Sequence, residues 1–158
     1  MKKLKYRGKY ISLFLYKKGG KTIEFIKIPN AVVIIPLIEN NKVILVKQYR
    51  FPIKRYLWEL PAGKVENKES ILKAAKRELL EETGYIGKIK KIGSFFVSPA
   101  FSNEIFHFFL AYDLKKVSDF NEKEIKEIKI FEIEKLKNSK DLKTYLAYYL
   151  IKNLSIIR

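Results

Sequence analysis

Three glutamates lie close together in a segment whose apolar residues repeat with the period of a helix. Glu78, Glu81 and Glu82 belong to the stretch ESILKAAKRELLEETG at residues 69–84. At about 100° per residue their side chains fall within an arc of roughly 100°. Like charges one turn apart destabilise a helix by about 0.2–0.5 kcal/mol. A divalent cation would remove that repulsion, since hard ions such as magnesium are held by a few carboxylates together with substrate phosphates.

The sequence also predicts where this helix begins and ends. It should span 68–83, with Asn67 as the N-cap and Glu69 in the first turn, where the helix dipole favours an acid. Gly84 is placed to end the helix in the left-handed conformation. The stripe expected to face the core is Leu72, Ala75 and Leu79. An ordinary solvated acidic face is the alternative to a metal site, screened by Lys73, Lys76 and Arg77.

Charge is distributed unevenly along a strongly basic chain. The formal net charge is +16; residues 1–58 carry 14 basic and two acidic residues, whereas residues 59–82 carry six of the 17 acids. An excess of lysine and arginine indicates either a polyanionic partner or the lysine-rich surface of a thermophile. An acidic cluster inside a basic protein suggests a metal site that has to hold an anionic substrate.

The composition excludes several kinds of chemistry. The chain has no cysteine, so disulfides, thiolate nucleophiles and cysteine metal sites are ruled out, and its single histidine, His107, rules out chemistry that needs two. Apolar runs such as 31–38 are too short to cross a bilayer, so no membrane partner is expected. The start is basic and then apolar, but its apolar part is too short for a signal peptide. We expect a strand there, in a cytoplasmic protein.

Hydrophobic patterning predicts one α+β domain over residues 1–158, an α/β/α sandwich with a central mixed sheet. An antiparallel hairpin within residues 1–29 should form from strands 9–18 and 21–28, joined by Gly19 and Gly20. Residues 30–38 form a continuous apolar run, which predicts a strand buried on both faces. Further strands are expected at 42–50, 56–63, 88–98, 104–114 and 125–133, and a last helix at 141–154.

The acidic helix and its flanks together resemble one known family. Gly63, Glu69 and the run RELLEETGY at 77–85 match the signature of the Nudix hydrolases, with Tyr85 where an aliphatic residue is more general. The resemblance implies a loop–helix–loop that binds Mg²⁺ or Mn²⁺. Glu78 and Glu82 would be the principal ligands, joined by Glu81 and the carbonyl of Ala62. Gly63, Glu69, Arg77 and Gly84 would be structural, with Glu69 paired to Arg77.

Segments outside the signature resemble the ADP-ribose pyrophosphatase branch. They are QYRFPIKRYLWELPAGKVE at 48–66, SPAFSNE at 98–104 and the tail at 140–152. Ala100 stands where that branch has glycine. The resemblance implies that Arg50 reaches the phosphates and that Glu104 lines the site. An edge-strand surface charge and a loop-capping carboxylate are the respective alternatives.

The base that activates water is expected outside the signature, in the loop at 118–127. Glu124 is the favoured candidate because it adjoins the strand beginning at Ile125, and Glu122 is the other. A carboxylate can serve as a base only if it lies near the attacking water. Both residues could instead be ordinary solvated glutamates.

The resemblance therefore implies metal-dependent hydrolysis of the pyrophosphate bond of ADP-ribose or a related nucleoside diphosphate sugar, giving AMP and a sugar phosphate. Dinucleoside polyphosphates and RNA 5′ ends are alternative substrates. A nucleic-acid-binding module on an inactive fold is the non-enzymatic alternative, which the intact glutamates disfavour. The branch is commonly homodimeric, and the apolar N-terminal hairpin at 1–29 is compatible with a dimer.

Overall fold

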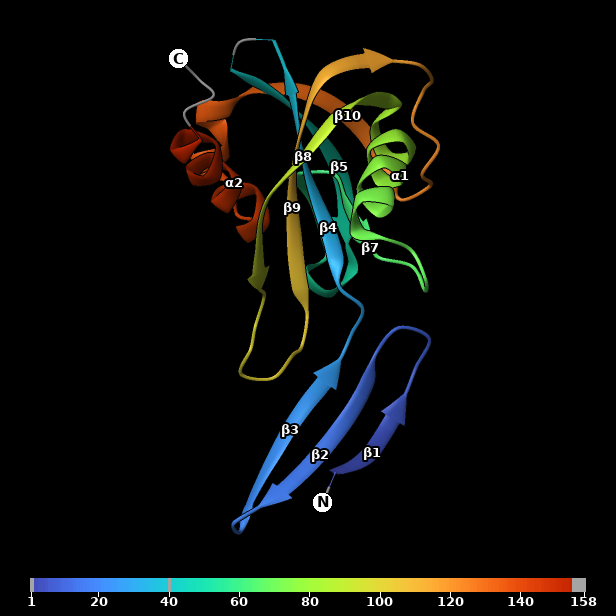
Figure 1. The fold of residues 1–158 in the computed structure, drawn as a ribbon, viewed down its shortest axis with the longest axis vertical. Helices are drawn as coiled ribbons and strands as arrows, with labels where there is room; N and C mark the ends of the chain where they lie inside the picture. Colours follow the sequence, from blue (N-terminus) through green and yellow to red (C-terminus); the bar gives the residue numbers. More distant parts are fainter. Residues whose placement is uncertain (1, 40, 155–158) are drawn as a thin grey trace.

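A computed structural model describes residues 2–39 and 41–154 of the chain. Its body is a seven-stranded mixed sheet between two helices, and a separate three-stranded sheet lies below it (Figure 1). The helices are α1 (Ile71–Thr83) and α2 (Leu142–Asn153). The N-terminal strands are β1 (Lys2–Arg7), β2 (Ser12–Lys18) and β3 (Lys21–Lys27). The body strands are β4 (Ala31–Ile38), β5 (Lys42–Arg50), β6 (Arg55–Glu59), β7 (Ala62–Lys64), β8 (Tyr85–Phe96), β9 (Ile105–Lys116) and β10 (Ile125–Glu132). Two 3-10 helices are η1 (Phe51–Ile53) and η2 (Ile133–Asn138).

Strand β4 organises the large sheet, whose order is β10-β5-β4-β9-β8. It runs parallel to β9, with Ala31 opposite Phe106, whereas the other pairs in this sheet are antiparallel. The end of β4 pairs with β5 and its beginning pairs with β7. Strand β7 is thereby held at the middle of the sheet, directly before the segment that leads into α1. The predicted mixed sheet and sandwich are confirmed.

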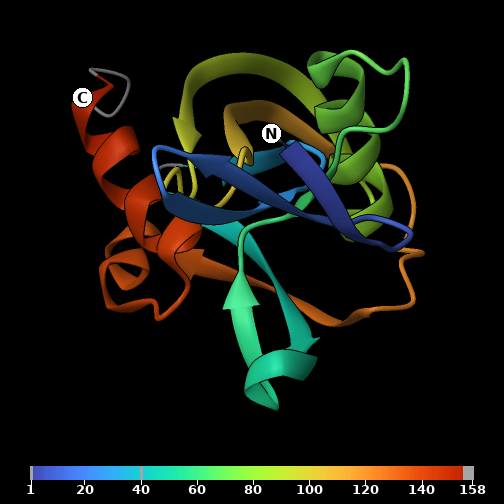
Figure 2. The ribbon, with the colours of Figure 1, turned by 90° about the horizontal axis from the view of Figure 1, so that it is seen from below.

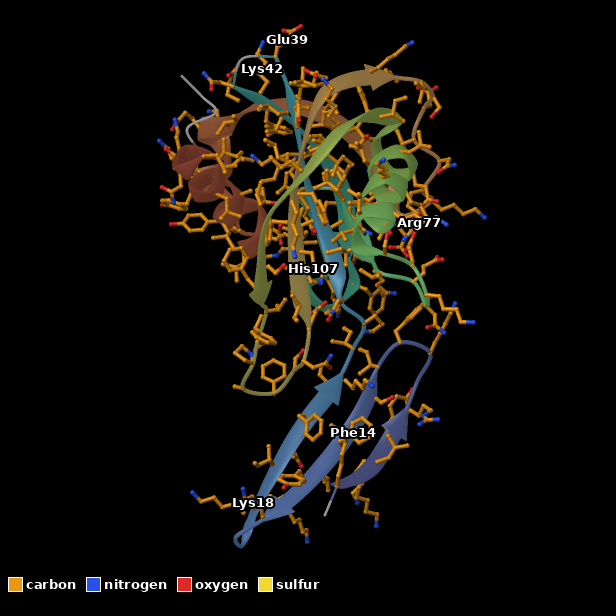
Figure 3. The ribbon with its side chains drawn as sticks, in the orientation of Figure 1. Phe14, Lys18, Glu39, Lys42, Arg77 and His107 are labelled. Atoms are coloured by element: carbon orange, nitrogen blue, oxygen red, sulfur yellow. The ribbon has the colours of Figure 1, made fainter. Side chains whose placement is uncertain are left out.

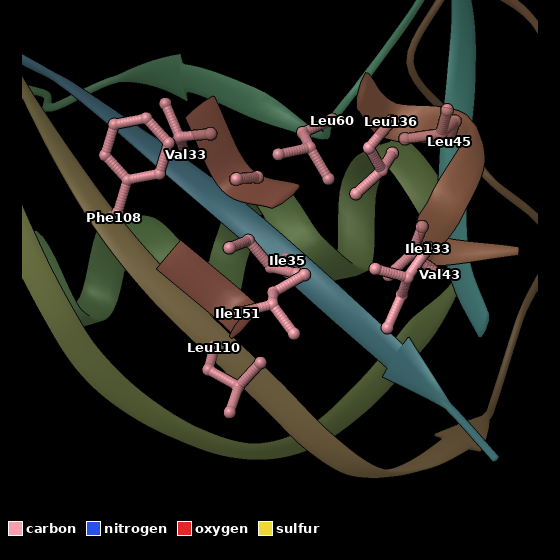
Figure 4. Packing of buried hydrophobic residues seen from close by; sticks show 11 residues of the cluster. Val33, Ile35, Val43, Leu45, Leu60, Phe108, Leu110, Ile133, Leu136 and Ile151 are labelled. Carbon is pink, nitrogen blue, oxygen red and sulfur yellow. The ribbon is translucent and has the colours of Figure 1, made fainter. Parts of the chain in front are cut away.

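The core has two layers because both faces of β4 are buried. Val33 and Ile35 pack in the cluster beneath α2 and η2 (Figure 4). Val32 and Ile34 pack on the other face against Ala74, Ala75 and Leu79 of α1. Each buried side chain of the valine or isoleucine type contributes about 1.5–3 kcal/mol. The continuous apolar run thus forms a strand covered on both sides, as predicted.

Helix α1 begins later and faces the core differently from the prediction. Its N-cap is Ser70, whose hydroxyl accepts a hydrogen bond from Lys73 N at 3.2 Å, so Asn67 is not the cap and Glu69 precedes the helix. The left-handed backbone of Lys68, at φ 65°, keeps the chain out of helical geometry there. Leu72 is 44% exposed, because the small pair Ala74 and Ala75, together with Leu79, forms the contact with the sheet.

The other end of α1 follows the prediction. Gly84 adopts φ 76° and its amide donates to Leu80 O at 2.8 Å. A side chain at this position would also meet the backbone of Ser118, with a Cβ 2.1 Å from its carbonyl oxygen. Glycine therefore both ends the helix and allows the loop after β9 to pack against the helix end.

The N-terminal region is a sheet of three strands, whereas the sequence predicted a hairpin. The turn at Gly19 and Gly20, at φ 56° and 74°, forms the expected hairpin, and β1 pairs with its free edge. Phe14 stacks on Phe25 with ring centroids 5.4 Å apart, and Figure 3 shows Phe14 on this sheet, away from the body. Seen from below, the three strands lie across the base of the body (Figure 2).

No helix within residues 2–39 and 41–154 is long and apolar enough to cross a membrane. The cytoplasmic location stays a prediction.

Candidate active site

A cavity of about 1170 Å³ brings together most of the predicted site residues. It is bordered by α1, β5, β7 and the loop between β1 and β2. The predicted residues in its lining are Arg50, Ala62, Gly63, Arg77, Glu78, Glu82, Glu104 and Glu124, together with the alternative base Glu122. Glu69, Glu81 and Gly84 are not part of this lining. Residues distant in sequence therefore meet at one end of the sheet.

Arg77 joins the acidic residues to one another. Its Nε and Nη2 each donate to Glu69 at 3.0 Å, and Nη2 also donates to the carbonyl of Lys64 at 3.1 Å. Its Nη1 donates to Glu78 at 2.7 Å and to Glu81 at 3.0 Å. These bonds, above all those to Glu69, raise the pKa of Arg77. Arg77 lies midway along α1, beside which Figure 3 labels it, and its bond to Lys64 O ties the helix to β7.

Gly63 leaves room for the Glu78 carboxylate because it has no side chain. A Cβ at residue 63 would lie 1.9 Å from Glu78 Oε1 and 2.0 Å from its carboxyl carbon. Any side chain there would have to displace the carboxylate. The glycine of the signature thus permits β7 to approach the acidic face of α1 without a gap.

Glu82 is the most deeply buried acid of the three. It is 4% exposed and accepts one hydrogen bond, from Ala62 N at 3.1 Å. Burial, and then the neighbouring Glu78 carboxylate, raise the pKa of Glu82 to about 8. Burial also raises the pKa of Glu78, although Arg77 opposes the shift. Two carboxylates are thus held side by side, out of water, at an electrostatic cost.

The chemistry of this donor set fits a hard divalent cation. Carboxylate oxygens are the ligands that such ions prefer, and a cation would offset the repulsion between Glu78 and Glu82. In the described residues, no three acidic or histidine side chains converge closely enough to hold an ion. Glu78 and Glu81 instead share Nη1 of Arg77, and Glu82 is bonded to Ala62. Loading an ion would therefore require these side chains to turn from their present partners.

A buried network of ion pairs lies beside Glu78 and Glu82. It was not predicted from the sequence. Arg50 donates Nε and Nη2 to Glu59 at 2.7 and 2.6 Å, and Lys143 of α2 contacts the same carboxylate. Burial alone would raise the pKa of Glu59, but Arg50 and Lys143 hold it below its usual value. Lys143 also pairs with Asp141 at 3.1 Å. Arg50 is thus an anchored residue on the cavity wall and not a free surface charge.

We expect Lys143→Met to lower the free energy of unfolding by about 3 kcal/mol, because it leaves part of a buried carboxylate network uncompensated. Lys152→Met is the matched control on the same helix: Lys152 pairs with Glu134 at 2.8 Å but its side chain is 45% exposed. An exposed pair of this kind contributes about 0.5 kcal/mol. Urea denaturation of both variants at pH 7 measures the difference, and equal losses would contradict it.

The loop after β9 brings the candidate bases to the cavity. Its backbone is tied to the end of α1, where Asn121 N donates to Glu81 O at 3.0 Å. The side chain of Glu124 accepts a hydrogen bond from Gln48 Nε2 at 2.7 Å, while the side chain of Glu122 lines the cavity and has no hydrogen bond among the described residues. Glu124 is therefore the more firmly positioned of the two.

Glu104 and two aromatic residues complete the account of the predicted positions. Burial raises the pKa of the Glu104 carboxyl, whose oxygens bond to no described residue, so it does not cap its loop. Trp58 packs edge-to-face on Phe131 at 5.0 Å, and His107 bonds to Ser94 at 2.8 Å. Neither Trp58 nor His107 lines the cavity.

Relatives of known type share both sequence and fold with this chain. An ADP-ribose pyrophosphatase of Bacillus subtilis is 36% identical over 163 residues, covering 96% of this chain and 88% of that protein. An ADP-sugar pyrophosphatase of Mus musculus is 43% identical over 82 residues, covering 49% of this chain and 38% of that protein. The crystal structure of an ADP compounds hydrolase superposes with a TM-score of 0.81 at 19% identity, covering 97% of this chain and 90% of that one, which shows a common fold.

The fold presents buried carboxylates of one helix to a large cavity. Together with these relatives, this identifies the chain as a pyrophosphohydrolase. The NUDIX domain model matches residues 27–152, which is most of the chain. The protein belongs to the Nudix family.

Proposed function

We propose that the protein hydrolyses the pyrophosphate bond of ADP-ribose, or of a closely related nucleoside diphosphate sugar, to AMP and a sugar phosphate. The observation that carries the proposal is the pairing of buried Glu78 and Glu82 in the cavity that also holds Arg50 and Glu104. The ADP-ribose pyrophosphatase of Bacillus subtilis, similar over nearly the whole chain, supports the choice of substrate.

In this proposal Glu78, Glu81, Glu82 and the carbonyl oxygen of Ala62 hold Mg²⁺ or Mn²⁺. The bound cation supplies neutralisation of the negative charge on the diphosphate. Arg77, through its bonds to Glu69 and Lys64, keeps the helix in register with β7 so that Glu78 and Glu82 face the cavity.

Arg50 and Glu104 bind the substrate in the same proposal. Because Nε and Nη2 of Arg50 are engaged by Glu59, Nη1 is the guanidinium nitrogen left to donate to a phosphate oxygen. Such charge-assisted bonds hold the diphosphate in one orientation. Glu104, with no hydrogen-bond partner for its carboxylate among the described residues, is available to accept from a sugar hydroxyl.

A substrate panel tests the proposal. ADP-ribose, several nucleotide sugars, diadenosine polyphosphates and triphosphorylated RNA are each incubated with magnesium or manganese, and the products are resolved by chromatography. We expect ADP-ribose to give AMP and ribose 5-phosphate with the highest kcat/KM, and chelation by EDTA to abolish turnover. Preference for RNA 5′ ends or diadenosine polyphosphates would overturn the choice of substrate, and turnover in EDTA would overturn the metal.

Glu124 acts as the general base in this proposal, taking a proton from the attacking water. We expect Glu124→Gln to lower kcat by about 10²–10⁴-fold, the usual contribution of such a base, with KM little changed. Glu122→Gln is the matched control in the same loop, and we expect it to change kcat by less than about threefold. The reverse ranking in steady-state kinetics would assign the role to Glu122.

We propose further that the chain works as a homodimer through its N-terminal sheet. Leu4, Tyr6 and Ile23 on that sheet are 40%, 61% and 46% exposed. Strand β3 meets the body through few hydrogen bonds, such as Ile26 N to Phe101 O at 2.7 Å. A small sheet with uncovered apolar side chains gains stability when a second surface covers it. Sedimentation velocity should report a dimer that becomes a monomer when residues 1–28 are removed, and a monomeric full chain would contradict this.

A further inference from the structure

A second cavity, of about 410 Å³, lies between α1 and the bent strands β8 and β9. None of its lining residues lines the catalytic cavity. Helix α1 contributes Lys76 and Leu79 to it, the immediate neighbours of Arg77 and Glu78. The volume falls in the range of about 300–1,000 Å³ that is typical of small-molecule sites.

The walls of this cavity are apolar at the base and cationic at the rim. Leu79, Ile86 and Ile89 form the apolar part. The charged residues around it are Lys76, Lys88, Lys115 and Asp113. Lys88 is paired with Asp113 at 2.8 Å. Lys76 and Lys115 have no ion pair within the described part of the chain, so two ammonium groups beside an apolar surface are left uncompensated.

An irregularity in the β8–β9 pair shapes this cavity. The register runs from Ile86 opposite Lys115 to Lys88 opposite Tyr112, so Gly87 faces two residues of β9. One of them, Asp113, has a left-handed backbone with φ 52° inside a strand. Gly87 has no room for a side chain, because a Cβ would lie 2.7 Å from the backbone oxygen of Tyr112. Bulges of this kind redirect side chains, and backbone strain of this kind concentrates at functional sites.

We propose that this cavity is a binding site for a small amphipathic anion, meaning an aromatic or short aliphatic body that carries one carboxylate, sulfonate or phosphate. The apolar part of the ligand packs on Leu79, Ile86 and Ile89, and its anionic group lies between Lys76 and Lys115. Asp113 neutralises Lys88, so the remaining charge matches one or two negative charges and not a polyanion. The site is separate from the catalytic cavity and does not depend on the proposed function.

The probe that tests the site is 8-anilinonaphthalene-1-sulfonate, with N-phenyl-1-naphthylamine as its neutral counterpart. Titrated into ¹⁵N-labelled protein, the sulfonate should shift the amide signals of Gly87, Ile89 and Lys76 in a saturable manner. The neutral compound should bind at least tenfold more weakly, because it lacks the group that the lysines recognise. Shifts confined to other apolar surfaces, such as exposed Phe96 and Phe101, would overturn the proposal, as would equal affinity for both compounds.

Matched variants distinguish binding at this cavity from a general effect of the positive net charge. The double variant Lys76→Met/Lys115→Met should raise the Kd for the sulfonate at least tenfold. The control Lys126→Met/Lys129→Met removes the same charge from exposed positions on β10 and should leave the Kd within about twofold. Ile86→Asp, at a position 44% exposed and so tolerant of a polar residue, should weaken binding both by removing apolar contact and by repelling the anionic group. An unchanged Kd in both cavity variants, once thermal unfolding shows that they are folded, would overturn the assignment.

Discussion

Replacing Glu82 with glutamine should lower kcat for ADP-ribose by about 10³-fold or more and leave the protein folded. Loss of this carboxylate removes a principal ligand of the proposed cation, and a factor of 10³ corresponds to about 4 kcal/mol of transition-state stabilisation. The fold should persist because the amide oxygen of glutamine can still accept the bond from Ala62 N at 3.1 Å. Steady-state kinetics and thermal unfolding in EDTA measure the two effects separately.

Glu132→Gln provides the control for this experiment. Glu132 is an exposed acid at the end of β10, outside the cavity, and its replacement makes the same change from carboxyl to amide. We expect its kcat to stay within about twofold of the wild-type value. Isothermal titration with Mn²⁺ should show weakened binding for Glu82→Gln and none of that loss for Glu132→Gln. Full turnover by Glu82→Gln would remove the basis of the proposed function.

Gly63→Ala should lower kcat by about 10²-fold with a small change in stability. The added methyl group would lie 1.9 Å from Glu78 Oε1, so the carboxylate has to move. The end of a glutamate side chain moves at little cost to the fold, and Gly63 does not have the positive φ that would strain alanine. Displacement of a catalytic group by about 1 Å can cost about 10²-fold in rate.

A double-mutant cycle shows whether the loss of kcat in Gly63→Ala results from displacement of Glu78. If the methyl group acts only by displacing that carboxylate, Gly63→Ala should have almost no further effect on kcat in a Glu78→Gln background. Additive losses would mean that residue 63 acts through the backbone of β7 instead. A fall in the unfolding temperature large enough to explain the lost activity would also contradict the prediction.

Features with a local cause were predictable from the sequence. The continuous apolar run at 30–38 predicted the buried strand β4, Gly19 and Gly20 marked the hairpin turn, and Gly84 marked the end of α1. The carboxylate face of α1 followed from helical period, because position along a regular helix fixes direction. The predicted N-cap, Asn67, was wrong, because the left-handed backbone of Lys68 keeps the chain out of the helix until Ser70.

Features that depend on partners distant in the chain were not predictable. In the sequence Glu59 and Lys143 are two charged residues with no visible connection. Only the packing of α2 on the sheet brings them into contact. In the same helix, Leu142 is 69% exposed while Thr144 is buried and accepts a hydrogen bond from Leu60 N, which depends on a partner 84 residues away. Leu72 was misassigned because two alanines allow α1 to approach closely, which leaves the larger residue outside.

The parallel pairing of β4 with β9 has a consequence for synthesis of the chain. Ala31 lies opposite Phe106, so the strand at the centre of the sheet lacks its parallel neighbour until most of the protein has left the ribosome. Non-local parallel pairings of this kind also close slowly. During translation the apolar segment at 31–36 therefore stays exposed to solvent. We expect a nascent-chain chaperone to bind it there.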